Sequence, residues 1–312
     1  MIRKNKIVID LIKKKVFIRG AILVSILGNS YNSLLLIRNC IENIIYRRLK
    51  RKYKKIAAEF KTNEEKKDLK QVESNIIWIC WFQGIENAPA VVRACFNSVK
   101  HFFPDKKIIV ITSENINSYV KFPDFIIDRY RKGIISNTAF SDLVRLELLI
   151  KYGGLWIDAT VLCTGNKLVN KLSESKSKFF MYQILKPGLD GHTVRFSSWM
   201  IYSYSNNQIL RMTRYLIYTY WKENNKQISY FLLHNFLELS STYYPEYLNK
   251  MIPFSSSVPH ELLLRLFDNY DEETYNFILS QSDFHKLTYK FNKENANKEN
   301  TYYKKIINEY LK

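Results

Sequence analysis

Short apolar runs alternate with amphipathic stretches through the middle of the chain. Each run is bounded by polar residues, which predicts buried strands, the third of them weak, at residues 76–82, 108–111, 125–127 and 155–157. Apolar positions at helical spacing predict helices over about 89–103 and 137–152, and Gly153-Gly154 would end the second helix. Strands that alternate with helices predict an α/β fold built on parallel strands.

The pattern changes in the second half of the chain. Two apolar runs, at residues 179–182 and 198–201, predict further strands. Beyond them the pattern is mainly helical and rich in Tyr, Leu and Lys. The segment after Lys290 is polar, and we expect it to fray apart from a short final helix. The expected main domain therefore spans 75–290, with a tail over 291–312.

The first 74 residues form a separate unit in this interpretation. Apolar side chains recur there at helical spacing, at Leu34, Ile37, Ile41, Ile44, Ile45 and Leu49. A dense basic cluster follows at residues 47–55, and the polar stretch 61–74 is typical of a linker. We therefore predict a basic amphipathic helical arm and linker over residues 1–74. The apolar stripe suits an interfacial helix on anionic lipid and equally a helix that packs on the main domain.

The chain carries a formal net charge of +19, most of it in the arm. Residues 1–70 hold 19 Lys and Arg against 6 Asp and Glu. Such an arm indicates contact with an anionic surface, either nucleic acid or anionic lipid. No nucleic-acid-binding module is recognisable, so we expect no nucleic-acid partner, and a nucleic-acid or anionic-surface binding protein is the rival interpretation.

Targeting signals and cysteine usage indicate the cellular compartment of the protein. No stretch of eighteen or more apolar residues occurs, and no convincing cleavage site follows the apolar run at 21–27. We expect a cytoplasmic protein, peripherally associated with the inner face of the cell membrane. The four cysteines form no Cys-x-x-Cys pair, which disfavours a zinc site and suits free thiols in a reducing compartment.

The candidate chemistry lies between residues 140 and 160. Asp142 and Arg145 are three residues apart and so share one face of the predicted helix. Gly153-Gly154 allows a sharp turn, and Asp158 follows at the carboxyl end of a strand, where open α/β sheets bind ligands. Taken singly, Asp142 and Arg145 suit a surface ion pair, Gly153-Gly154 suits the end of a helix, and Asp158 suits a cap. In this order and spacing, they favour a site for a metal-diphosphate.

Three motifs in order resemble a known family. Ser-Asp-x-x-Arg at 141–145 and Tyr-Gly-Gly-x-Trp-x-Asp at 152–158 look like the nucleotide-sugar site of GT-A glycosyltransferases. Together with an opening motif at 77–84 and a closing Ser-x-x-His-Lys-Leu-Thr-Tyr at 282–289, they resemble the capsular polysaccharide synthesis family, related to glycosyltransferase family 32. The resemblance covers about 75–290, without the arm. It implies a GT-A-like, Rossmann-like nucleotide-sugar-binding sheet with a helical C-terminal half.

The resemblance also implies roles for single residues. Trp81 would stack on uracil, Asp142 would contact the ribose or uracil, and Lys286 would bind phosphate, whereas Trp78 would be a core residue. Asp158 and Arg145 would be catalytic, the first as the leading acid of an Asp-x-Asp motif and the second as the brace of the site. The implied contacts to a UDP-sugar are Trp81, Gln83, Asp142, Arg145, Asp158 and Lys286.

A divalent metal, Mn²⁺ or Mg²⁺, is also implied, with Asp158, Thr160 and His285 as its candidate ligands. Thr160 stands where related families carry a second Asp, and a neutral hydroxyl is a poor ligand. The number of direct ligands is therefore open, and a catalytically inactive scaffold of the capsule machinery is a further alternative. For an active hexosyltransferase, the resemblance implies retention at the anomeric carbon and an oligosaccharide acceptor, which we expect to be lipid-linked.

Overall fold

A five-stranded sheet forms the centre of the computed structural model, which describes residues 17–64, 69–175, 177–184 and 195–311. The strand order is β2-β1-β3-β6-β5. The strands are β1 (Ile76–Cys80), β2 (Lys107–Ile111), β3 (Gly154–Ile157), β5 (Phe179–Gln183) and β6 (Phe196–Ser203). β1 pairs in parallel with β2 and β3, whereas β6 is antiparallel to β3 and β5. The predicted α/β class is confirmed, with a mixed sheet in place of a purely parallel one.

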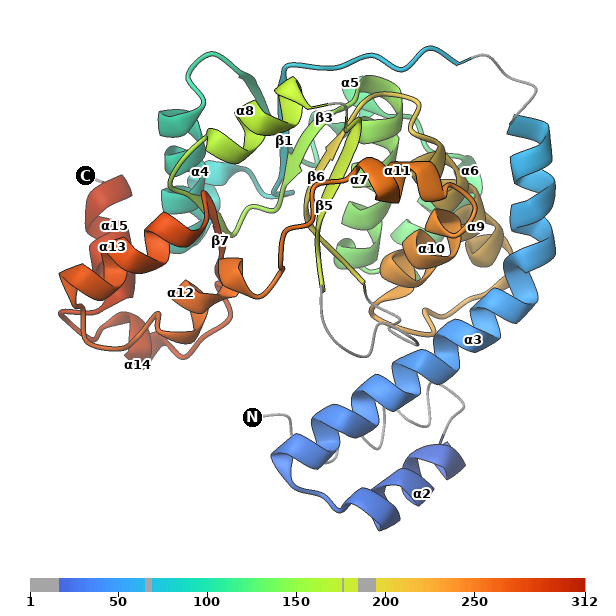
Figure 1. Ribbon diagram of the computed structural model, residues 1–312, viewed down its shortest axis with the longest axis horizontal. Helices are drawn as coiled ribbons and strands as arrows, with labels where there is room; N and C mark the ends of the chain where they lie inside the picture. The colour runs from blue at the N-terminus through green and yellow to red at the C-terminus, as the bar shows by residue number, and fades with distance from the viewer. Residues whose placement is uncertain (1–16, 65–68, 176, 185–194, 312) are drawn as a thin grey trace.

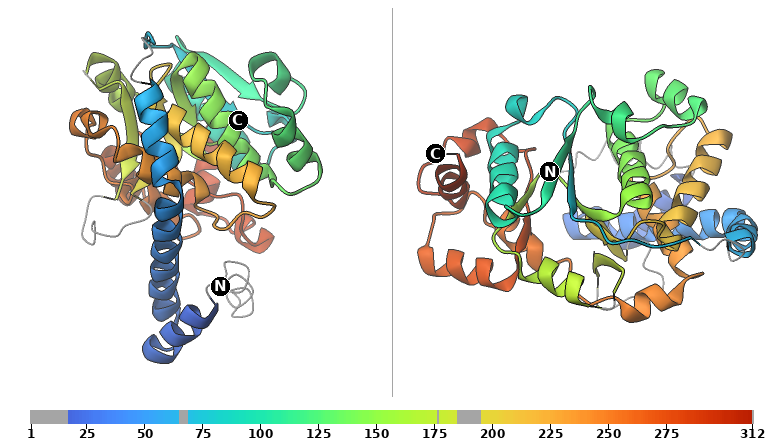
Figure 2. Two further views of the ribbon diagram at one scale, coloured as in Figure 1. Left: turned by 90° about the vertical axis from the view of Figure 1, so that its right-hand side faces the viewer. Right: turned by 90° about the horizontal axis from the view of Figure 1, so that it is seen from above.

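Helices cover both faces of this sheet, with α4 (Ala90–Phe102) on one side and α7 (Asn137–Tyr152) on the other (Figures 1 and 2). Helix α7 packs on α9 (Gln208–Glu223), which packs on α10 (Leu232–Ser241). The remaining helices of this part are α5 (Ile116–Tyr119), α6 (Asp124–Arg131), α8 (Lys167–Glu174) and α11 (Pro245–Lys250).

Helix α6 overturns the strand expected at 125–127. Pro123 precedes its first residue, Asp124 lies in its first turn, and Arg129 and Arg131 lie in its last turn. Charges so placed complement the helix dipole. Ile126 is fully buried while its two apolar neighbours are partly exposed. A run of three apolar residues cannot distinguish a strand from one buried helical turn.

A smaller unit, most of which follows the sheet in sequence, packs on the other side of α4. The antiparallel pair β4 (Val161–Cys163) and β7 (Phe284–Lys286) joins it to the main sheet region. Its remaining elements are η1 (Ile85–Asn87), η2 (Val258–His260), α12 (Glu261–Leu264), α13 (Glu272–Gln281), α14 (Lys293–Ala296) and α15 (Tyr302–Tyr310). Tyr302, Tyr303 and Ile306 of α15 are buried, so the segment after Lys290 does not fray as expected but closes this second core against α4.

The arm consists of α2 (Phe17–Leu27) and the long helix α3 (Tyr31–Glu64). Ile37, Ile41, Ile45 and Leu49 of the predicted stripe are buried in the same core as the sheet. The stripe therefore packs on the main domain. Helix α2 lies at the far end of α3, outside the main body (Figures 1 and 2). Within the described ranges, no helix combines the length and apolar character that a membrane crossing requires.

Candidate functional site

A cleft of about 640 Å³ opens at the carboxyl ends of β1 and β3. Six of the eight predicted site residues line it: Trp81, Gln83, Arg145, Asp158, Thr160 and Lys286. Trp81 directly follows β1 and meets the ring of Tyr289 edge-on, with 5.2 Å between ring centroids. Trp78, in contrast, is fully buried and donates from Nε1 to the carbonyl of Gly153, which confirms the core role predicted for it.

The turn between α7 and β3 places Asp158 at the cleft. Helix α7 begins at a capping bond, in which Ser136 Oγ accepts from Ala139 N, and ends at Gly153. Gly153 and Gly154 have φ of +69° and +102°, and a Cβ on Gly154 would lie 2.4 Å from the carbonyl oxygen of Ile76. Glycine is therefore required where β3 passes β1. Four residues later, Asp158 N donates to the carbonyl of Trp199 and fixes the end of the strand.

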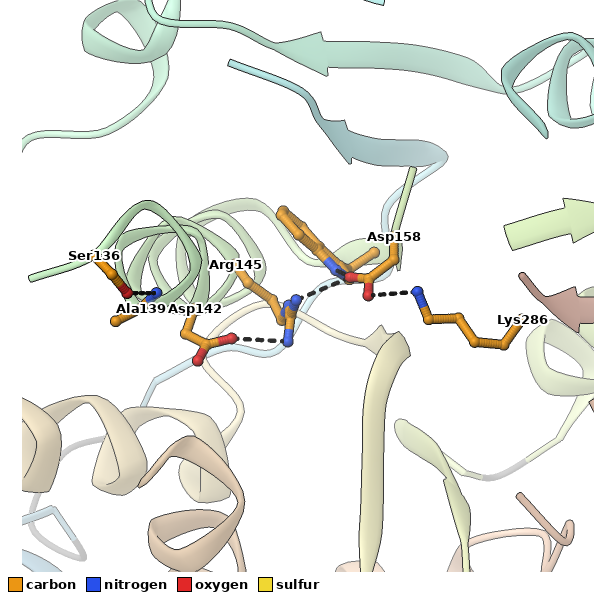
Figure 3. Close-up of polar contacts among 7 residues, drawn as sticks. Ser136, Ala139, Asp142, Arg145, Asp158 and Lys286 are labelled. Atoms are coloured by element: carbon orange, nitrogen blue, oxygen red, sulfur yellow. Dashed lines mark hydrogen bonds and ion pairs between the residues drawn. The ribbon is translucent and has the colours of Figure 1, made fainter. Parts of the chain in front are cut away.

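The charged groups of the site form a chain (Figure 3). Arg145 Nη1 lies 3.2 Å from Asp142 Oδ1, and Arg145 Nη2 lies 2.9 Å from Asp158 Oδ1. Lys286 Nζ lies 3.2 Å from Asp158 Oδ2. The guanidinium also stacks on Trp156, whose Nε1 donates to Asp158 Oδ1. Arg145 is only 5% exposed, so its charge is held in a fixed place.

The carboxyl groups of Asp142 and Asp158 have pKa values that are shifted in opposite directions. Burial raises the pKa of Asp142 to about 7, although Arg145 opposes the shift. Burial would also raise the pKa of Asp158, but Lys286 and Arg145 together outweigh it and hold that pKa below its usual value. Asp158 therefore stays ionised, whereas Asp142 changes charge near neutral pH. Asp142 does not line the cleft and reaches it through Arg145.

His285 does not reach the cleft, which corrects its place among the candidate metal ligands. It lies opposite Leu162 in the β4–β7 pair, next to Lys286, which lies opposite Val161. Successive side chains of a strand point to opposite faces, so Lys286 faces Asp158 and His285 faces away. His285 is fully buried, its Nε2 is 3.0 Å from Thr164 Oγ1, and burial lowers its pKa to about 4.

The residues at the cleft do not fit a divalent metal held by the protein. Among the described residues, no group of three or more His, Cys, Asp and Glu side chains could hold a metal ion. Asp158 and Thr160 face each other across Lys286, whose Nζ donates to Thr160 Oγ1 at 2.5 Å. The remaining oxygen of Asp158 already accepts from Arg145 and Trp156. The implied metal remains an untested prediction of the sequence.

Several cleft residues carry no motif that marks them in the sequence. Tyr230 enters from the loop between α9 and α10, and His260 from η2. Ser229, beside Tyr230, donates to Glu42 of α3, and Arg38 of α3 lies over the ring of Phe231. The arm therefore contacts the loop that forms one wall of the cleft. Only the tertiary fold brings these distant segments together.

Comparison with known proteins gives three findings. The model of the family described as "Capsular polysaccharide synthesis protein" matches residues 30–306, which include α3 and extend past the expected limits of 75–290. The chain is 34% identical over 92 residues to O-glycosyltransferase braB of Annulohypoxylon truncatum, across 27% of this chain and 22% of that protein. It is also similar to the solved PaToxG glycosyltransferase, with a TM-score of 0.39 and 14% identity, covering 66% of this chain and 83% of that one.

Proposed function

The chain belongs to the capsular polysaccharide synthesis protein family, and we propose that it is a glycosyltransferase that transfers a sugar from a UDP-sugar to an oligosaccharide acceptor. The observation that carries the proposal is the buried Arg145, held between Asp142 and Asp158 at the wall of a cleft. The cleft combines an aromatic wall at Trp81 with two fixed cations, Arg145 and Lys286. These are the groups that a nucleoside diphosphate needs.

The donor would lie with its base against Trp81 and its diphosphate toward Arg145 and Lys286. When the bond between the anomeric carbon and the phosphate oxygen breaks, both electrons of that bond pass to the leaving UDP. Fixed cations lower the energy of this growing negative charge more than they stabilise the ground state. Asp158 holds both cations in place, at 2.9 Å and 3.2 Å, and is a positioning group in this proposal.

Retention at the anomeric carbon is part of the proposal. Asp158 is the one carboxylate among the described residues that line the cleft, and each of its oxygens faces a cation. A carboxylate so engaged is a poor nucleophile. The acceptor hydroxyl would instead attack from the face that UDP leaves and pass its proton to a phosphate oxygen of the departing diphosphate. One carbon–oxygen bond breaks and one forms.

The acceptor is proposed to be a lipid-linked glycan at the inner membrane face. In Figure 1 the carboxyl ends of β1, β3 and β5 point toward the end of the molecule where α2 lies. Ile18, Ile22 and Ile26 of α2 are 75%, 53% and 71% exposed. Arg47 of α3 lines one surface pocket together with Arg19 and Ile22 of α2. Anionic lipid offers about 1 kcal/mol for each such cation near its surface.

A binding assay tests the donor proposal. Purified full-length protein is heated with UDP and a panel of UDP-sugars, and the melting temperature is followed. A ligand at 100 times its dissociation constant stabilises the native state by about 2.7 kcal/mol. We expect a rise with UDP that is lost in Asp158→Ala, and the best UDP-sugar then enters a transfer assay. No rise with any uridine nucleotide, with or without Mn²⁺, would remove the proposal.

A further inference from the structure

We propose that the Lys286 ammonium takes the place of a divalent cation between Asp158 and Thr160, so that donor binding and transfer need no metal. The proposal rests on the proposed glycosyltransferase function. It concerns which group supplies the positive charge at the diphosphate, and it starts from the disagreement between the implied metal and the residues found at the cleft.

The ammonium already occupies the space between the two oxygen donors. Lys286 Nζ is 3.2 Å from Asp158 Oδ2 and 2.5 Å from Thr160 Oγ1. Asp158 Oδ1 is engaged by Arg145 and Trp156. A divalent ion of the Mn²⁺ or Mg²⁺ type requires several oxygen ligands, with carboxylates among them. Such an ion could enter only if Lys286 gave up its contacts with both Asp158 and Thr160.

The backbone fixes this lysine beside the site. Lys286 lies directly opposite Val161, the residue after Thr160, and Leu287 N donates to the carbonyl of Thr160 at 2.8 Å. The side chain is 20% exposed, and its alternation with His285 directs it to the cleft. Lys286 is therefore built into the site by the β4–β7 pair and is not a mobile surface lysine.

Cations of the protein already face the oxygen donors of this site. Asp158 and Thr160 together carry a charge of −1, because the threonine hydroxyl is neutral. Lys286 faces this charge at Oδ2 and Arg145 faces it at Oδ1, whereas two carboxylates at these positions would carry −2 and call for a divalent ion. His285, the remaining candidate ligand, is bonded to Thr164 on the other face of β7. The hydroxyl at position 160 and the lysine at position 286 thus form a matched pair.

During transfer, the ammonium would turn from Thr160 toward the phosphate oxygen that gains charge. The bond changes are those given above: the anomeric carbon exchanges the phosphate oxygen for the acceptor oxygen, and the acceptor proton goes to the phosphate. Lys286 and Arg145 act only through their charge and hydrogen bonds.

The test measures UDP binding by calorimetry, in EDTA and in excess Mn²⁺, on metal-stripped full-length protein. We compare wild type with Lys286→Met, with Lys286→Arg, and with the control Lys293→Met, an exposed lysine on α14 outside the cleft lining. Wild type and the control should bind equally in both buffers. Lys286→Met should bind at least about tenfold more weakly in both, since hydrogen bonds to charged groups are strong, and Lys286→Arg should recover part of the loss.

The outcomes separate this inference from the function on which it rests. UDP binding by wild type that appears only with Mn²⁺ would overturn the role of Lys286 and leave the glycosyltransferase proposal standing. Folded Lys286→Met that binds UDP as well as wild type would do the same. If Lys286→Met fails to fold, the wild-type comparison alone decides. Absence of UDP binding in both buffers would instead reject the proposed function.

Discussion

Arg145 of α7 donates to Asp158 Oδ1 across 2.9 Å and thereby ties the middle of a buried helix to the end of β3. The same guanidinium holds Asp142 one helical turn away. Arg145 and Asp158 are 13 positions apart in the sequence, and the Gly153-Gly154 turn between them brings their side chains together. Ligand binding and fold stability therefore depend on one side chain.

Replacing Arg145 by Met should weaken both properties. Removing one partner from a buried ion pair leaves the other charge uncompensated, and we expect the free energy of unfolding in urea to fall by about 2 to 3 kcal/mol, with some relief because Asp158 is partly exposed. UDP binding should be lost. Arg93→Met, at an exposed position of α4, is the control and should change neither quantity. An Arg145→Met protein with wild-type UDP affinity would contradict the proposed donor site.

Binding of a UDP-sugar should weaken as the pH rises from 6 to 8. Burial raises the pKa of Asp142 to about 7, so this group is neutral below that pH and gains a negative charge above it. The added charge offsets Arg145 and opposes an anionic donor. Asp142→Asn should remove the dependence, since an amide does not titrate. A UDP-sugar is the better probe than UDP because its diphosphate has no ionisation in this range. The same slope in both proteins would show that another group titrates.

Adding a methyl group at Gly154 should displace β3. A Cβ there would lie 2.4 Å from a backbone carbonyl oxygen in a φ region that side chains avoid. We expect Gly154→Ala to lose at least about 2 kcal/mol of unfolding free energy. Gly133→Ala is the matched control, with φ of +69° and no atom within 4 Å of its Cβ, and it should lose about 1 kcal/mol. Equal losses would mean that the close approach to β1 is unimportant.

Removing the contact between α3 and the cleft loop should weaken acceptor binding more than donor binding. Ser229 donates to Glu42 of α3 at 2.5 Å and precedes Tyr230, which is 65% exposed in the cleft. In Ser229→Ala this bond is gone, and we expect a raised KM for the acceptor with unchanged UDP affinity. A fall in UDP affinity of the same size would place Tyr230 on the donor side.

Changing the exposed face of α2 should release the protein from membranes. Ile18, Ile22 and Ile26 replaced together by Ser should reduce binding to vesicles that contain phosphatidylglycerol, because exposed apolar area drives insertion at the interface. UDP binding should persist. Replacing the exposed Leu264 and Phe277 by Ser is the control. Vesicle binding that survives the α2 changes would place the membrane contact elsewhere, and absence of vesicle binding by the unchanged protein would reject it.

Local patterns predict the elements next to the cleft well. The helix expected at 137–152 has the bounds of α7, because apolar periodicity, a serine cap and a glycine stop act together over a short segment. The interpretation of residues 125–127 as a strand is wrong because three apolar residues carry no period. The short final helix is present as α15, but its burial could not be predicted, since its core side is made by α4, some 200 residues earlier.

The candidate site divides in the same way. Asp142, Arg145 and Asp158 lie in one local motif, and the structure brings them together. Lys286 and His285 lie in another motif. Which of the two side chains points into the cleft depends on how β7 pairs with β4, and sequence spacing cannot predict that pairing. The apolar stripe of α3 suited two surfaces, and only the packed structure shows that the domain covers it.

The pair formed by β4 and β7 also has a bearing on how the molecule is made. Thr160 and Lys286 are separated by 126 positions, and loops of that length close late because their ends must first find each other. During synthesis, the sheet and α7 can form while the chain beyond residue 280 is still inside the ribosome. The cleft then lacks Lys286. Capacity to hold the donor should therefore appear only after β7 has emerged and paired with β4, which makes nucleotide binding a marker of that pairing.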